Sequence, residues 1–174
     1  MLFNMDESLE ILERMPLVYE TLLNGLNEKW ISNNEGENTW SPYDVMGHLI
    51  HGEKTDWIPR MKIILDDGDK RFLQFDRFAQ FDESRGKSLE ELFKDFESLR
   101  TENLKILRSL TVTPEMLKSK GIHPEFGEVT LQQLLATWVV HDLAHLCQVA
   151  RVMAKQYGQQ IGPWAKYFSI FNKV

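Results

Sequence analysis

The chain has 174 residues, of which 43% are hydrophobic and 26% charged, and its formal net charge is −6. This length and composition predict one soluble globular domain over residues 1–174, with enough apolar residues for a core of its own. The acidic balance, without a cluster of Lys or Arg, argues against nucleic-acid binding. No apolar run reaches the roughly 20 residues of a membrane span and no signal sequence is recognisable, so we expect a cytoplasmic protein without membrane attachment.

Apolar residues recur at helical spacing along almost the whole chain, which predicts an all-α fold. The first helix is expected over residues 6–29, with Pro16 bending or dividing it. The polar residues 33–38 are expected to form an exposed loop. A serine cap followed by a proline then opens a second helix over residues 41–66, which Pro59 is expected to bend.

Two further long helices are expected over residues 88–110 and 130–157, each opened by a capping box. A short helical turn is expected at residues 113–116, a loop at 121–128, and a last short helix after Pro163. Four long amphipathic helices in one domain predict a four-helix bundle, here with short extra helices.

Phenylalanines recur at every third residue between the second and third helices, at Phe72, Phe75, Phe78 and Phe81. Aromatic side chains at such spacing mostly serve packing. We therefore interpret them as a cover over one end of the bundle, in preference to a wall of a substrate site.

His141 and His145 lie four residues apart in the fourth helix, and therefore on one face of it. The same face carries the apolar residues Leu134, Trp138, Val149 and Val152, so both imidazoles are expected to point inward. Inward imidazoles are typical of a transition-metal site, but a buried histidine satisfied by one hydrogen bond is the simpler alternative. Cys147, the only cysteine, lies on the opposite side of this helix and is interpreted as a small buried apolar residue.

His48 shares a face of the second helix with Val45 and Leu49, and Gly52 leaves room beside it. Periodicity alone does not show that His48 meets the pair on the fourth helix. His51 lies at the edge of this face and is expected to be partly exposed. His123 precedes a proline and is expected at the surface.

Two segments resemble motifs of the DinB/YfiT-like superfamily. Residues 40–49, WSPYDVMGHL, are similar to the motif of its second helix, and residues 141–148, HDLAHLCQ, are similar to a later helix motif with two histidines four residues apart. The loop at residues 123–128, which leads into Thr130, also resembles the family's approach to that helix. The order and spacing of these motifs agree over nearly the whole chain.

The resemblance implies the four-helix bundle of that family, commonly a homodimer, with a divalent metal held by His48, His141 and His145. Three neutral imidazoles leave a metal at least one open position. Zn²⁺ or Ni²⁺ suits these ligands best, and their type also permits Fe²⁺ or Mn²⁺. The side chains considered for orienting the imidazoles are Asp142, Glu53, Asp56 and Gln148. No residue is singled out as a catalytic base.

Relatives in this family suggest a metal-dependent thiol S-transferase, acting in detoxification or the stress response. Its substrates would be an electrophile and a small thiol of the bacillithiol, mycothiol or glutathione type. An alternative is a hydrolase that uses a metal-bound water whose pKa is lowered toward about 7. A third hypothesis is a non-catalytic metal-binding or stress-response module.

Overall fold

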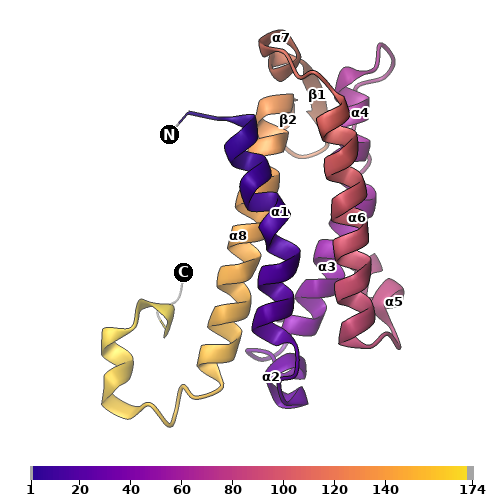
Figure 1. The fold of residues 1–174 in the computed structure, drawn as a ribbon. Helices are drawn as coiled ribbons and strands as arrows, with labels where there is room; N and C mark the ends of the chain where they lie inside the picture. The colour runs from indigo at the N-terminus through magenta and orange to yellow at the C-terminus, as the bar shows by residue number, and fades with distance from the viewer. Residues whose placement is uncertain (1, 172–174) are drawn as a thin grey trace.

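A computed structural model describes residues 2–171 of the chain and is largely helical (Figure 1). The long helices are α1 (Met5–Leu23), α3 (Pro42–Thr55), α4 (Trp57–Leu65), α6 (Leu89–Ser109) and α8 (Leu131–Lys155). The short elements are α2 (Glu28–Ser32), α5 (Ala79–Ser84), α7 (Pro114–Lys118), β1 (Lys120–His123), β2 (Gly127–Thr130) and the 3₁₀ helices η1 (Gly162–Tyr167) and η2 (Ser169–Phe171).

The helices form a four-helix bundle in which α3 and α4 follow one another along a single column (Figure 1). In Figure 1, α1 and α8 run downward, whereas the α3–α4 column and α6 both run upward. Because two successive columns run in the same direction, a long connection has to return the chain to the foot of the bundle. Residues 66–78 and α5 make this return. The predicted all-α four-helix bundle is therefore confirmed, and no helix in the described part of the chain could cross a membrane.

The three predicted capping boxes are all present. In each, the side chain of the cap residue accepts a hydrogen bond from the backbone N–H three positions on, and the side chain at that position accepts one from the cap residue's own N–H. The pairs are Ser41 with Asp44, Ser88 with Glu91, and Thr130 with Gln133.

The limits of two predicted helices were wrong. The first ends at Leu23, because Gly25 adopts a left-handed backbone (φ 74°) that turns the chain before the separate helix α2. Pro16 lies within α1 and does not divide it. The second helix breaks at Asp56 (φ −108°, ψ −69°), and Pro59 lies in the first turn of α4, where a missing N–H costs little.

The predicted loop at residues 121–128 contains an antiparallel hairpin of β1 and β2, which the helical spacing of the sequence did not indicate. Phe72 donates its backbone N–H to the carbonyl of Ile122 at 2.9 Å, so the returning connection is tied to this hairpin. The Phe72 ring lies against Gly121, where a Cβ would be only 2.5 Å from a ring carbon. A glycine at this position is therefore required for the contact.

The core consists of two apolar clusters along the bundle axis. One, beside the hairpin, includes Leu12, Trp57, Leu104 and Trp138; the other, nearer α2 and α5, includes Met15, Leu49, Phe96 and Val149. Buried polar residues of α3, α6 and α8 lie between the two apolar clusters. These residues are Glu53, Arg100, Asn103 and Asp142, and together they form a buried polar layer.

Arg100 is the centre of this buried polar layer. Its guanidinium contacts the carbonyl oxygen of Leu12 at 2.7 Å, Oε1 of Glu53 at 2.8 Å and Oδ2 of Asp142 at 2.7 Å. Burial alone would lower the pKa of Arg100, but the carboxylates of Asp142 and Glu53 more than offset this and raise it. The arginine therefore stays charged and joins α1, α3 and α8 to α6.

Neutral donors complete the buried polar layer. The indole Nε1 of Trp138 donates to Oε1 of Glu53 at 3.0 Å, and Nδ2 of Asn103 donates to Oε2 of the same carboxylate at 3.0 Å. The hydroxyl of Tyr19 donates to the backbone carbonyl of Asp142 at 3.0 Å. Such partners are needed because a buried charge without them is costly.

Replacing Arg100 by Met should lower the free energy of unfolding by about 3–5 kcal/mol, because it leaves two buried carboxylates without their cation. Urea unfolding followed by circular dichroism measures the loss. The matched control is Arg85→Met, which removes an exposed arginine paired only with Asp82 and should cost less than about 1 kcal/mol. Equal losses in the two variants would contradict the role assigned to Arg100.

Candidate metal centre

The structure brings the three predicted ligand residues together from two helices. His48 projects from α3, and His141 and His145 project from successive turns of α8. Nε2 of His48 lies 3.0 Å from Nε2 of His141, and one nitrogen from each of the three rings falls within 4.8 Å of the others. The partner that periodicity could not supply for the α8 pair is thus provided by α3.

This spacing fits a single metal ion. Two imidazole nitrogens bound to one tetrahedral zinc, at about 2.0–2.1 Å each, lie about 3.3 Å apart. The nitrogens of His48 and His141 are 3.0 Å apart, and a nitrogen of His145 lies within 4.8 Å of both rings' ligand atoms. A ligand set of three imidazoles suits Zn²⁺, Ni²⁺ or another divalent transition metal.

A neighbouring side chain orients one of the rings. Nδ1 of His145 lies 2.8 Å from Oε1 of Gln148, and because an amide oxygen only accepts, this Nδ1 carries the proton. The lone pair of His145 is therefore on Nε2. Nδ1 of His141 lies 3.7 Å from Oδ1 of Asp142 in the buried polar layer. Gln148 thus occupies the position expected of a residue that orients a metal ligand, whereas Asp142 lies beyond hydrogen-bond distance of His141.

Burial keeps two of the imidazoles neutral. It lowers the pKa of His48 to about 2, with a further contribution from repulsion by His145 and His141. It also lowers the pKa of His145 to about 4, again with repulsion from His141. Neutral imidazoles are the form that binds metals, so both rings are ready to act as ligands at neutral pH.

The buried polar layer adds a negative charge beside the histidines. Glu53 and Asp142 carry two negative charges and Arg100 one positive charge, and all three side chains are at most 2% exposed. In a weakly screened interior, the excess negative charge favours a cation at the neighbouring histidines. Asp142 belongs to both groups, since its carboxylate contacts Arg100 and lies next to His141.

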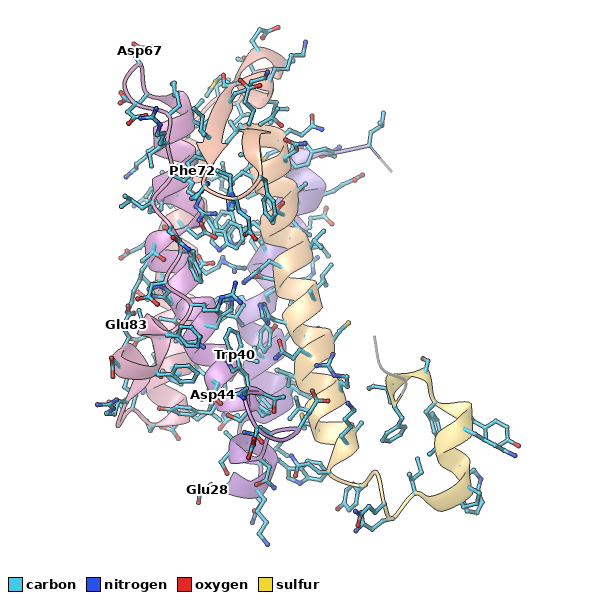
Figure 2. All side chains as sticks on the ribbon, turned by 180° about the vertical axis from the view of Figure 1, so that it is seen from behind. Glu28, Trp40, Asp44, Asp67, Phe72 and Glu83 are labelled. Atoms are coloured by element: carbon cyan, nitrogen blue, oxygen red, sulfur yellow. The ribbon has the colours of Figure 1, made fainter. Side chains whose placement is uncertain are left out.

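Aromatic rings enclose the histidine cluster. The ring of Trp40 lies 4.7 Å from that of His48 and 6.2 Å from that of His145, nearly parallel to the latter. The ring of Phe75 lies edge-on to His48 at 5.5 Å. Figure 2 labels Trp40 and Phe72 on the side of the bundle where α8 faces the α3–α4 column. These rings contribute to the burial of His48, which is 7% exposed.

Two clefts adjoin the cluster. The first, the charged cleft, has a volume of about 590 Å³ and is lined by His48 and His141 together with Asp56, Arg60, Arg77, His123 and Glu125. The second, the aromatic cleft, has a volume of about 660 Å³ and is lined by Trp40, Phe78, Phe81, Gln148 and Arg151. Arg77 lines both clefts and therefore lies between them.

The phenylalanine prediction was correct for one residue only. Phe72 is 6% exposed and belongs to the core. Phe75 lines the charged cleft, and Phe78 and Phe81 line the aromatic cleft. The returning connection runs along the bundle and places successive phenylalanines at different depths, which their spacing in the sequence does not show.

Two further predictions were wrong. His51 is buried, with 5% exposure, because α5 and the connection before it cover that side of α3; its Nδ1 lies 2.8 Å from Oε1 of Glu83. Cys147 is exposed, because it lies on the outer side of α8.

His123 is partly buried, with its ring stacked on that of Phe126 at 4.5 Å, and it lines the charged cleft. Arg60 and Arg77, which also line this cleft, were not recognised as site residues, because single arginines carry no spacing signal.

A comparison with protein families assigns the fold. The profile of the DinB superfamily matches residues 11–149, a span that includes all three histidines of the cluster. The chain belongs to the DinB superfamily.

A solved structure has a similar fold. It is YfiT from Bacillus subtilis, described as a probable metal-dependent hydrolase with an unusual four-helix bundle topology. The TM-score is 0.73 at 17% sequence identity, and the match covers 88% of this chain and 87% of YfiT. The bundle of this DinB protein is therefore of the YfiT type. A search of curated proteins found no match.

The metal-free protein should lose stability as the pH falls from about 6.5 to about 4. The pKa of His48 and that of His145 are lowered on folding, so the unfolded chain takes up protons in this range that the folded chain does not. Each histidine should contribute about 1.4 kcal/mol per pH unit to the slope of unfolding free energy against pH. Urea unfolding at several pH values, with His48→Gln for comparison, measures this; an unchanged slope in the variant would contradict the buried neutral state of His48.

Proposed function

We propose that this DinB protein is a divalent-metal-dependent enzyme whose ligands are His48, His141 and His145, and that it transfers a small thiol to an electrophile. The observation that carries the metal proposal is the convergence of three imidazole nitrogens within 4.8 Å. A divalent ion bound there would supply Lewis acidity, which lowers the pKa of a coordinated thiol and holds the thiolate in place.

The two clefts support a reaction with two substrates. Each has a volume typical of small-molecule sites. His48 and His141 line the charged cleft, and Trp40, whose ring packs against His48, lines the aromatic cleft. The charged cleft suits a polar thiol, because it combines Asp56, Arg60 and His123. The aromatic cleft suits an apolar electrophile, because Trp40, Phe78 and Phe81 provide ring surfaces.

In the proposed reaction, the thiol sulfur attacks an electrophilic carbon held in the aromatic cleft. A carbon–sulfur bond forms and the bond to the leaving group breaks, so the leaving group departs with its electron pair and the thiol proton passes to solvent. Trp40 and Phe75 limit the access of water to the histidines, since both rings pack against His48. Exclusion of water protects the thiolate and strengthens the electrostatic interactions around it.

Hydrolysis is the second candidate, and the position of Asp56 favours it. This carboxyl lines the same cleft as His48 and His141, and burial raises its pKa. A carboxylate in such a place can take a proton from an attacking water. The description of YfiT as a probable metal-dependent hydrolase agrees with this candidate. Dependence of turnover on added thiol separates it from thiol transfer.

The purified protein should bind one divalent metal ion per chain. His48→Ala, His141→Ala and His145→Ala should each reduce metal affinity by at least about tenfold, because two imidazoles remain for an ion that needs three or more protein ligands. Elemental analysis and competition with a chelating dye measure the binding. The control, His123→Ala, removes a histidine of the charged cleft from outside the triad and should retain the metal. Full binding by the triad variants would rule out this site.

The metal-loaded protein should conjugate a small thiol to a chlorinated or epoxide acceptor, with bacillithiol, mycothiol and glutathione as the thiols to compare. Removal of the metal should reduce the rate by at least about a hundredfold, because the thiolate is then neither formed nor held. Product is measured by mass spectrometry, and activity should return when metal is restored. Conjugation that continues unchanged in the metal-free protein would rule out thiol transfer at this site, whereas turnover of an ester or amide without thiol would favour the hydrolase.

A further inference from the structure

The side chain of Arg60 is held in a fixed position at the wall of the charged cleft. Its Nε lies 2.5 Å from Oδ1 of Asp56, one helical turn earlier, and its Cζ lies 5.1 Å from the centre of the Phe72 ring. Only 10% of the Arg60 side chain is exposed. The carboxylate and the ring therefore both restrict the position of the guanidinium.

These two contacts leave the outer edge of the guanidinium unused. The ion pair with Asp56 occupies Nε, and the stacking on Phe72 occupies one face of the plane. Among residues 2–171, no hydrogen bond to Nη1 or Nη2 of Arg60 is present. An arginine held in this way presents two parallel N–H groups, which match the two oxygens of a carboxylate.

The charge of the cleft also favours an anion once a metal is bound. Arg60 and Arg77 offset the negative charges of Asp56 and Glu125, and a divalent ion at His48 and His141 leaves the cleft with an excess positive charge of two. A thiolate alone would neutralise half of it. A carboxylate on the same molecule would neutralise the rest.

We propose that Arg60 is a specificity-determining residue that binds the carboxylate of the substrate in the charged cleft, so that the small thiol is a mercaptocarboxylate. This inference rests on the proposed metal-dependent function. Asp56 acts through Arg60 as a positioning residue, because its ion pair with Nε holds the guanidinium at the wall of the charged cleft. Sulfur at the histidine cluster and carboxylate at Arg60 fix the thiol at both ends.

The test uses the full chain loaded with Co²⁺, whose absorption reports ligands directly without turnover. Mercaptoacetate, 3-mercaptopropionate and 4-mercaptobutyrate are compared with the mercapto-alcohols of the same length, and binding is followed by the sulfur-to-cobalt absorption band. At the length that spans the cleft, the carboxylate compound should bind about ten- to a hundredfold more tightly than its alcohol, as expected for a charge-assisted bidentate pair.

Three variants test whether Arg60 causes the preference for the carboxylate compounds. Arg60→Gln should abolish this preference while leaving the affinity for mercapto-alcohols unchanged. Arg60→Lys should reduce the preference, because lysine keeps the charge but lacks the two parallel N–H donors of the guanidinium. Arg85→Gln, which alters an exposed arginine outside both clefts, should retain the full preference. Thermal unfolding and the cobalt spectrum show whether each variant is folded with an intact metal site; should Arg60→Gln not fold, the lysine variant gives the answer. No preference at any length, or equal loss in the Arg60 and Arg85 variants, would overturn the proposal.

A second pair of probes separates this inference from the proposed thiol transfer. Succinic monohydroxamate and acetohydroxamate bind metals through the same group, but only the first carries a carboxylate. If no thiol gives a sulfur-to-cobalt band while the succinic compound still binds more tightly in an Arg60-dependent way, thiol transfer is wrong and the role of Arg60 stands. If thiols bind but neither series shows a carboxylate preference, the role of Arg60 is wrong and thiol transfer stands.

Discussion

Arg100 connects the helices of the bundle through a buried charge, and the rest of the structure depends on this arrangement. Its guanidinium contacts the Leu12 carbonyl on α1 and the carboxylates of Glu53 on α3 and Asp142 on α8. Apolar side chains on either side could pack in more than one register, because hydrophobic contact is non-directional. The geometry of an arginine between two carboxylates is much more restrictive, so the buried polar layer fixes how far α3, α6 and α8 are shifted along one another.

The same layer positions the candidate metal centre. Asp142 is adjacent in sequence to His141, and Glu53 follows His48 by five residues, so the helix positions that fix Arg100 also fix the histidines at the next level of the bundle. The parallel course of the α3–α4 column and α6 then requires the long returning connection. That connection passes beside the histidines, where Phe75 packs on His48 and Arg77 divides the two clefts. The parallel course of the α3–α4 column and α6 thus accounts both for the ring that packs on His48 and for the clefts beside it.

The sequence predicted those parts of the fold that depend on local patterns. The capping boxes at Ser41, Ser88 and Thr130 act within one turn, and helical periodicity placed His141 and His145 on one inward face. The meeting of His48 with this pair came from the family resemblance, because no local pattern encodes a contact across the bundle. The burial of His51 and the charged cleft depend on segments distant in sequence. A signal for Arg100 was present, since it shares the apolar face of its helix with Phe96, but a single charge on such a face has no unique partner in the sequence.

Charge accounts for the division between the buried polar layer and the charged cleft. The layer carries a net negative charge that solvent barely screens, and it therefore favours a cation at the histidines. Burial keeps the imidazoles of His48 and His145 neutral, so these two rings do not repel that cation. On the other side of the histidines, the charges of Arg60 and Arg77 offset those of Asp56 and Glu125 in the charged cleft. A divalent ion at the histidines would therefore give this cleft its excess positive charge, while the buried polar layer behind the ion is negative. An anionic substrate would then bind the metal with one group and Arg60 with another, so that each of its charges meets a cation.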